Sequence, residues 1–413
     1  MSEAASIDGP TRASASFASG YDDPSGRAPH VGTNVALFSA YYPAHGGGME
    51  LACADLAVAL TKAGMHVEWV SQATDEPPRE DSIKFTPVPG TDFVYSLSGV
   101  PVPFPMPWAF PAVSRAVARA GVVVIAEANF ALSAIAFLVA KWHGKPVLLV
   151  QHVGEPSTVS KIARFVMRLG ETLAVRPMIR RADVVVCVSP VVARHFAGVR
   201  TGSDCVTIGH GLDLELFRPP AGLLEKDADR DALNVTRDKP VAAFVGRLTE
   251  SKGVLAVAEM ARRRPDWTFV VAGIGPMDPA RWGLPNMVLT GQLDRMQVAK
   301  LYRASDVALL PSPSESFSLV VREALASGCR VLCSEQILET DECLHPYIVT
   351  EKVDSSDWAG TGARYAAALD RQSAATMEEA RAYIAEQCSP DRLFGQYVDI
   401  IHRLVARASG GRS

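Results

Sequence analysis

The chain has 413 residues, of which 48% are hydrophobic and 21% charged, so a disordered or fibrous protein is excluded and two or three domains are expected. The 41 Lys and Arg residues against 45 Asp and Glu residues give a net charge of −4, which argues against a dedicated nucleic-acid-binding protein. The seven cysteines include no CxxC pair, so neither a disulfide framework nor a zinc ribbon is indicated.

Residues 1–33 are predicted to be a disordered N-terminal tail. They are rich in Ser, Ala, Gly, Asp and Pro and contain no apolar stretch typical of a signal peptide. No later segment has the roughly 18 to 20 uninterrupted apolar residues that a membrane span needs. We therefore expect a cytoplasmic protein with reduced thiols.

Residues 34–217 are predicted to form an N-terminal Rossmann-like domain. Short apolar runs alternate there with helical patterns, and a strand–helix–strand order implies a parallel sheet. The expected strands are 35–38, 66–70, 122–126, 147–151, 184–188 and 206–208, and the expected helices are 49–62, 131–141 and 161–176.

The stretch 218–240 is rich in Pro, Asp, Lys and Arg and is predicted to be an interdomain linker. The same alternation then resumes in a second Rossmann-like domain, residues 241–388. Its expected strands are 241–245, 268–272, 287–289, 307–310 and 330–333, and its expected helices are 253–263, 294–304 and 319–326. The fold class is thus α/β with two doubly wound domains, whose ligands bind beyond the carboxyl ends of the strands. The cleft between the domains is the expected site.

Two glycine-containing loops follow strands. Gly46-Gly47-Gly48 precedes the first helix, where glycine allows close backbone approach and the helix N-terminus attracts phosphate; a plain tight turn is the alternative. In Gly246-Arg247-Leu-Thr-Glu-Ser-Lys252-Gly253, two cations flank a loop that opens a helix. Arg and Lys there suit a diphosphate, because Arg binds oxygens as a fork and Lys as a point charge.

Two carboxylates, Glu315 and Glu323, lie eight positions apart after the predicted strand 307–310. A carboxylate accepts charge-assisted hydrogen bonds from sugar hydroxyls, so one acid suits a hexose and the other a ribose. Backbone N–H groups near Ser318 to Val320 are expected to meet phosphates between them.

In these motifs the chain resembles the retaining glycosyltransferases of family 4, which have the GT-B fold and an E-x7-E motif. The resemblance spans nearly all of residues 34–407. It is carried, in order, by the segments 43–50, 182–189 and 208–219, by Gly246-Arg247 with Lys252-Gly253, by the segments 272–276 and 301–306, and by Glu315 to Glu323.

The resemblance implies a role for each matching position. Arg247 and Lys252 would stabilise the leaving diphosphate, Glu315 would contact the donor sugar and Glu323 the ribose. His152 would lie beside the donor sugar as a catalytic residue with Arg247, Lys252 and Glu315. The further donor-binding positions are Gly47, Gly48, Gly246, Phe317, Ser318, Leu319 and Val320. The resemblance also implies that residues 389–413 form a helix that crosses back to the N-terminal domain, and that the activity is transfer of a hexose from a nucleotide-diphosphate sugar.

The chain departs from the family pattern at three places. One is the stretch after Cys333, an atypical version of the family's Gly-Gly-x-x-Glu segment, to which no donor contacts are assigned. The usual Glu-Gly-Phe-Gly reads Glu315-Ser316-Phe317-Ser318, which leaves the identity of the sugar open. The usual Asn-Gly reads His210-Gly211, at a hinge where little effect on chemistry is expected. Asp227 and Asp229 have the DxD spacing of manganese sites, but they lie in the charged linker and are interpreted as solvated, so no metal or other cofactor is expected.

The acceptor half carries a basic amphipathic pattern over 161–176, with Lys161, Arg164 and Arg168 beside apolar residues. Peripheral contact with the anionic inner face of the membrane is one interpretation, and a core-facing helix with a solvated basic face is the other. The apolar stretch 101–110 either lines an acceptor pocket or touches lipid.

Two alternative functions stay open: a GT-B-fold nucleotide-sugar epimerase, which needs no acceptor, and a non-catalytic partner protein that keeps the fold. A non-catalytic protein that keeps only the fold is expected to have lost Arg247, Lys252 or Glu315, and all three are present. We expect UDP or GDP as the donor nucleotide. The acceptor (small molecule, natural product, glycan or lipid) and the oligomeric state stay open.

Overall fold

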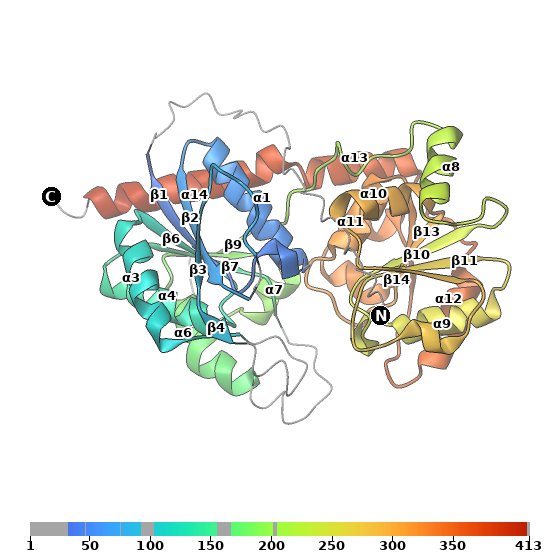
Figure 1. Ribbon diagram of the computed structural model, residues 1–413, viewed down its shortest axis with the longest axis horizontal. Helices are drawn as coiled ribbons and strands as arrows, with labels where there is room; N and C mark the ends of the chain where they lie inside the picture. The colour runs from blue at the N-terminus through green and yellow to red at the C-terminus, as the bar shows by residue number, and fades with distance from the viewer. Residues whose placement is uncertain are drawn as a thin grey trace, which may run out of the picture.

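A computed structural model describes residues 32–45, 47–74, 76–91, 103–154, 167–200 and 205–410. Two domains lie side by side, each a parallel β-sheet with helices on both faces (Figure 1). This is the GT-B architecture expected from the sequence. No helix in the described ranges has the length and apolar character needed to cross a membrane.

The N-terminal domain is built on a seven-stranded sheet in the order β3-β2-β1-β6-β7-β8-β9, and every neighbouring pair is parallel. The inner strands β6 and β7 are buried along their whole length, because helices cover both faces of the sheet. The strands are β1 (Asn34–Phe38), β2 (His66–Gln72), β3 (Lys84–Val88), β6 (Val122–Ala126), β7 (Val147–Gln151), β8 (Val184–Cys187) and β9 (Cys205–Thr207). β4 (Gly90–Thr91) and β5 (Phe104–Pro105) form a separate antiparallel pair.

The helices of this domain divide between the two faces of its sheet. On one face α1 (Gly48–Lys62) contacts α14 (Pro390–Gly410), and on the other α3 (Phe110–Arg119) packs on α4 (Ala131–Trp142) (Figure 1). α6 (Arg176–Arg181) and α7 (Pro190–His195) complete the domain. Of the helix predicted over 161–176, residues 161–166 lie outside the described part, and the described helix includes a π-turn, Glu171–Val175, and continues to Arg181.

The stretch 101–110, predicted to be an apolar loop, is more regular than expected. Pro101 and Val102 lie outside the described residues, Phe104–Pro105 pairs as β5, and Pro107–Ala109 forms a 3-10 turn that leads into α3. The side chains of Phe104, Trp108 and Phe110 are exposed.

The C-terminal domain has a six-stranded parallel sheet in the order β12-β11-β10-β13-β14-β15. Its strands are β10 (Val241–Val245), β11 (Thr268–Ala272), β12 (Met287–Gly291), β13 (Val307–Leu310), β14 (Arg330–Ser334) and β15 (Val349–Glu351). α10 (Arg295–Ala304), α11 (Leu319–Ala326) and α13 (Met377–Gln387) cover one face, and α9 (Val254–Arg263) and α12 (Trp358–Ala368) the other (Figure 1). The predicted helices 294–304 and 319–326 agree almost to the residue with α10 and α11. Asp294 and Gln297 form a capping box at the N-terminus of α10.

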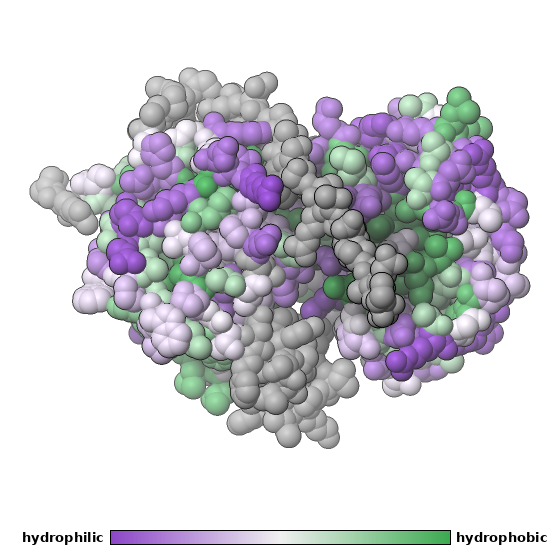
Figure 2. Space-filling view, viewed as in Figure 1, coloured by the Kyte–Doolittle hydropathy of each residue, from purple (hydrophilic) through white to green (hydrophobic). Residues whose placement is uncertain are grey.

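The interpretation of residues 218–240 as a linker is wrong for much of its length. They contain α8 (Leu223–Ala232), which packs on α10 of the C-terminal domain. Asp229, predicted to be solvated, is buried and pairs with Arg303 at 2.7 Å, and Arg230 pairs with Asp306 at 2.8 Å. Together with a third ion pair, between Lys226 and Asp306 at 2.7 Å, they fix this helix to the domain. The polar composition reflects these pairs. The helix begins with the exposed Leu223 and Leu224, and Figure 2 shows hydrophobic side chains at its upper right, where Figure 1 places α8.

The long C-terminal helix α14 begins at the boundary between the domains and packs on the N-terminal domain. It follows the C-terminal domain in sequence, yet Leu393, Tyr397 and Ile401 are buried in the core of the N-terminal domain. Figure 1 shows it, in red, running across that domain. The segment after β9 is connected to the start of α14, because the backbone N–H of Leu212 donates a hydrogen bond to the carbonyl of Cys388 at 2.9 Å.

Candidate functional site

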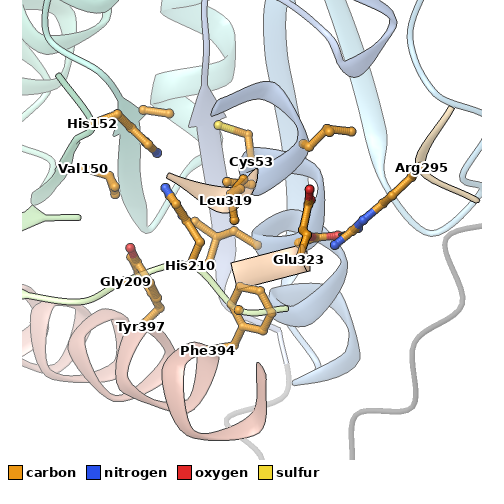
Figure 3. A pocket seen from close by; sticks show the side chains of 16 residues that line it. Cys53, Val150, His152, Gly209, His210, Arg295, Leu319, Glu323, Phe394 and Tyr397 are labelled. Atoms are coloured by element: carbon orange, nitrogen blue, oxygen red, sulfur yellow. Dashed lines mark hydrogen bonds and ion pairs between the residues drawn. The ribbon is translucent and has the colours of Figure 1, made fainter. Parts of the chain in front are cut away.

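An interdomain pocket lies at the carboxyl ends of the N-terminal strands, between α1, α10, α11 and α14. Its polar groups come from both domains: Asp55, His152 and His210 from the N-terminal side, and Arg295 and Glu323 from the C-terminal side (Figure 3). Apolar groups, among them Leu319, Phe394 and Tyr397, close the rest of the wall. The pocket thus forms at the domain boundary, where the sequence predicts the site.

His152 directly follows β7 and is buried in this pocket. Its backbone N–H, and that of Val153, each donate to Glu127 Oε2 at 2.9 Å. Glu127 follows the neighbouring strand β6 in a left-handed conformation, φ 76°, which is uncommon for a residue other than glycine. Burial raises the pKa of Glu127 to about 7, although the backbone N–H donors of His152 and Val153 oppose the shift. Glu127 therefore fixes the backbone that carries His152.

His210 lies beside His152, a placement that the sequence analysis did not anticipate for a hinge residue. The two imidazole rings are stacked, with centroids 5.2 Å apart and planes 13° apart, and Figure 3 shows them turned toward one another. Burial lowers the pKa of His152 to about 4. Burial, His152 and Arg322 together lower the pKa of His210 well below its ordinary value. Both rings are therefore neutral at physiological pH.

Glu323, predicted to contact the ribose, is the fifth residue of α11, just over one turn from its start, and faces the pocket (Figure 3). The hydroxyl of Tyr302 lies 3.5 Å from its Oε2. Burial raises the pKa of Glu323 to about 7, and the nearby Arg295 opposes that shift. Arg295 itself forms an ion pair with Asp55 of α1. A carboxylate with a pKa near 7 and a cation beside it can accept hydrogen bonds from a polar ligand.

The predicted cationic loop and the first glutamate of the pair also meet. Lys252 Nζ lies 2.6 Å from Glu315 Oε1, and the two side chains are 33% and 11% exposed. Arg247 is exposed in the same loop, directly after Gly246 and β10. Gly253 has φ 75°, and a Cβ there would lie 2.1 Å from the carbonyl oxygen of Pro311, so this position requires glycine. The close approach brings the loops after β10 and β13 together.

The N-terminus of α11 carries the other predicted donor-binding residues. Ser318 precedes Leu319 and Val320 and has a left-handed backbone, φ 58° and ψ 78°. Phe317 packs against the N-terminal core and meets His210 edge-on, with ring centroids 4.8 Å apart. The Arg322 guanidinium lies 3.9 Å from the centre of the Phe317 ring.

The glycine loop of the N-terminal domain reaches the same helix. Gly47 caps α1 and Gly48 begins it, whereas Gly46 lies outside the described residues. A Cβ on Gly48 would lie 3.3 Å from Leu319 Cδ1. The absence of side chains thus lets the N-terminus of α1 lie against the N-terminus of α11 across the domain boundary.

The structure therefore groups the predicted site residues in two places. His152, Leu319 and Glu323 line one pocket, while Lys252 and Glu315 form an ion pair in the adjoining loops and are not among the residues that line it. Sequence reasoning missed Glu127, Asp55, Arg295 and His210. The sequence position of Glu127 indicates a site residue, since it directly follows a predicted strand. Asp55 and Arg295 lie within predicted helices, and nothing in the local sequence distinguishes them from surface residues. In the described ranges, no three His, Cys, Asp or Glu side chains gather as a metal site would require.

Two family models match consecutive parts of the chain. The model described as Glycosyltransferase Family 4 matches residues 46–216, and that described as Glycosyl transferases group 1 matches residues 225–360. The first covers most of the N-terminal domain. The second begins in α8, in agreement with the packing of that helix on the C-terminal domain.

Individual relatives are similar over different lengths. A D-inositol 3-phosphate glycosyltransferase of Saccharomonospora viridis is 27% identical over 78% of this chain and 81% of its own length. A D-inositol 3-phosphate glycosyltransferase 2 of Catenulispora acidiphila is 34% identical, but the match spans only 31% of this chain and 34% of that relative. Among solved structures, Anabaena HepE in complex with UDP and glucose superposes with a TM-score of 0.69 at 15% identity, covering 89% of this chain and 99% of HepE.

Proposed function

We propose that this chain, which belongs to the family 4 type of GT-B-fold glycosyltransferases, transfers a hexose from a nucleotide-diphosphate sugar to an acceptor with retention of configuration. The C-terminal domain binds the donor, and the N-terminal domain supplies most of the acceptor site. UDP is our first choice of nucleotide, because the structurally similar HepE is described in complex with UDP and glucose.

The observation that carries this proposal is the ion pair between Lys252 and Glu315, 2.6 Å apart beyond the carboxyl ends of β10 and β13. These strands are neighbours, so their loops converge on one point of the cleft. The pair balances both charges while no donor is bound. With a donor in place, Glu315 accepts from the sugar hydroxyls, and Lys252 and the exposed Arg247 face the diphosphate. Fixed cations in a partly buried site stabilise the charge that builds on the leaving group.

His152 is assigned to the sugar side of the cleft. Its imidazole is neutral, and its Nδ1 is buried with no hydrogen-bond partner among the described residues. A buried imidazole nitrogen of this kind is satisfied when a ligand hydroxyl or carbonyl reaches it. In the reaction we propose, the acceptor attacks from the face of the leaving group and the departing phosphate takes the acceptor proton, so no protein nucleophile and no metal is required.

The test combines donor binding with turnover. A thermal-shift screen with UDP, GDP and ADP sugars identifies the donor, and turnover is then measured with a panel of acceptors that includes D-inositol 3-phosphate, after the names of the relatives. Lys252→Ala and Glu315→Gln are each expected to lower turnover at least about ten-fold, equivalent to about 1.4 kcal/mol. The anomeric configuration of the product, read by NMR, tests retention.

Glu259→Gln is the matched control, because Glu259 accepts from Arg263 at 2.7 Å on α9, outside the predicted site. It is expected to keep wild-type turnover. Wild-type turnover in both Lys252→Ala and Glu315→Gln, with unchanged melting temperatures, would contradict the proposal. Donor conversion without any acceptor would favour the epimerase, and donor binding without turnover over the whole panel would favour the non-catalytic partner.

We propose further that the acceptor half contacts anionic membrane. Leu169 and Leu173, one helical turn apart, are 48% and 69% exposed, and Arg168 beside them is exposed. Figure 2 shows hydrophobic side chains at the lower end of this domain, where Figure 1 places the same helix. Apolar side chains with a basic rim suit the membrane interface. Vesicles rich in anionic lipid should sediment the protein at low salt, and Leu173→Asp and high salt should each release it.

A further inference from the structure

A row of ring and guanidinium contacts crosses the domain boundary at the pocket. His152, at the end of β7, stacks on His210, and His210 meets the ring of Phe317 edge-on at 4.8 Å. The Arg322 guanidinium lies 3.9 Å from the centre of the Phe317 ring. The four side chains therefore connect the end of a strand in the N-terminal domain to the first turn of α11 in the C-terminal domain.

The far end of this row is anchored by hydrogen bonds. Arg322 donates to the backbone carbonyls of Phe317 and Ser318 and lies 3.4 Å from Asp341. The backbone of Gly209 touches the same ring, since a Cβ there would lie 2.7 Å from Phe317 Cε2. Phe317 is thereby held in one place, and it holds His210 against His152.

We propose that His210 is a positioning residue: it fixes the plane of the His152 imidazole and ties that orientation to the contact between the two domains through Phe317. This inference rests on the proposed function, in which His152 lies beside the donor sugar. Two neutral stacked rings attract through dispersion and ring electrostatics. Without the contact with Phe317, His210 would lose its support, and His152 would be free to turn away from the sugar.

The pKa of His152 is a measure of the contact between His152 and His210, because His210 also keeps water from the His152 ring. Loss of the His210 side chain lets water reach His152, and better hydration of the charged form moves the pKa of His152 upward from about 4 toward its ordinary value. Other titratable or charged groups surround the two rings and stay in place in such a variant. They are Glu127 after β6, Cys53 and Asp55 on α1, Arg295 on α10, Arg322 and Glu323 on α11, and Tyr397 on α14.

The experiment uses the full-length protein with ¹³C-labelled histidine rings, and the His152 signal is assigned from its loss in His152→Gln. His210→Ala removes the ring, whereas His210→Phe keeps a flat ring that excludes water and stacks. We expect the titration midpoint of His152 to rise by at least about one pH unit in His210→Ala and to move much less in His210→Phe. His66→Ala, at the exposed amino end of β2, is the control for altered histidine content.

Kinetics provide the second measurement. His210→Ala is expected to lower kcat about ten-fold with little change in the KM for the donor, and to move the acid limb of the pH profile to higher pH; His210→Phe is expected to recover part of kcat. An unmoved His152 titration in a folded His210→Ala protein overturns the inference. So does a kcat in that variant equal to that of the wild type. Absence of turnover in the wild type instead refutes the proposed function, and the NMR titration still decides whether His210 controls His152.

Discussion

Arg295 of α10 and Asp55 of α1 form an ion pair that joins the two domains. The two residues are 240 positions apart in the sequence, and Arg295 Nη1 lies 2.9 Å from Asp55 Oδ1. Their side chains are 20% and 22% exposed. Burial raises the pKa of Asp55, although the Arg295 charge opposes the shift. The pair closes one end of the pocket that also holds His152 and Glu323.

A double-mutant cycle measures what this pair contributes. Asp55→Asn and Arg295→Gln should each lower the free energy of unfolding, because each leaves a largely desolvated partner without its counter-charge. The double variant should lose less than the sum, with a coupling energy of about 0.5–3 kcal/mol in denaturant titrations. The pair Glu259–Arg263 within α9, in which the Arg263 side chain is 50% exposed, serves as the control and should couple by about 0.3–0.5 kcal/mol. Strict additivity at Asp55 and Arg295 would show that the pair does not stabilise the domain contact.

Ser318→Gly should stabilise the protein by about 1 kcal/mol. Ser318 has a left-handed backbone, φ 58°, which costs a residue with a Cβ about 1–2 kcal/mol relative to glycine. Its hydroxyl is also buried without a hydrogen-bond partner among the described residues. The greater freedom of glycine in the unfolded chain offsets part of the gain. Ser318→Ala keeps the left-handed backbone strain and should therefore gain less stability than Ser318→Gly. A lower melting temperature in Ser318→Gly than in Ser318→Ala would show that the backbone at this position is not strained.

Gly209→Ala should destabilise the protein by about 1–3 kcal/mol, because the added Cβ would lie 2.7 Å from Phe317 Cε2 and must displace that ring. The matched control is Gly395→Ala on α14, where a Cβ meets nothing within 4 Å. That helical substitution should stabilise the protein by about 0.5–1 kcal/mol. The two changes add the same methyl group, so opposite signs in chemical denaturation isolate the contact with Phe317. Equal changes in the free energy of unfolding would mean that the Phe317 ring moves aside at no cost in stability.

Donor affinity should fall as the pH drops through about 7. Burial raises the pKa of Glu323 to about 7, so the carboxylate that accepts the ribose hydroxyls in our proposal is progressively lost below that pH. Calorimetric titration of the donor between pH 6 and pH 8.5 should show the decline. Glu323→Gln should bind more weakly at high pH and without this dependence. Arg295→Gln removes a charge that lowers the pKa of Glu323, so its midpoint should move to higher pH; an identical pH profile in Glu323→Gln would assign the effect to another group.

Much of the fold was predictable because its signals are local. The apolar runs over 122–126 and 147–151 became β6 and β7 without change. The helix over 319–326, which carries Glu323, was also predicted to the residue. Its preceding loop brings Glu315 to Lys252 because adjacent parallel strands end at the same edge of a sheet. The polar composition of residues 218–240 led to the wrong prediction of a linker. A charged residue that forms an ion pair with a folded domain cannot be distinguished, in the sequence, from a charged residue exposed to water.

The composition of the chain indicates a protein of two or three domains, and strand and helix periodicity reduces this number to two Rossmann-like domains with motifs beyond strand ends. Periodicity reports which face of an element is buried, and it does not report which distant element covers that face. The pairing of Asp55 with Arg295, and the packing of His210 between His152 and Phe317, depend on how the two domains meet. Only the tertiary structure decided those contacts, because they join positions with no local relationship along the chain.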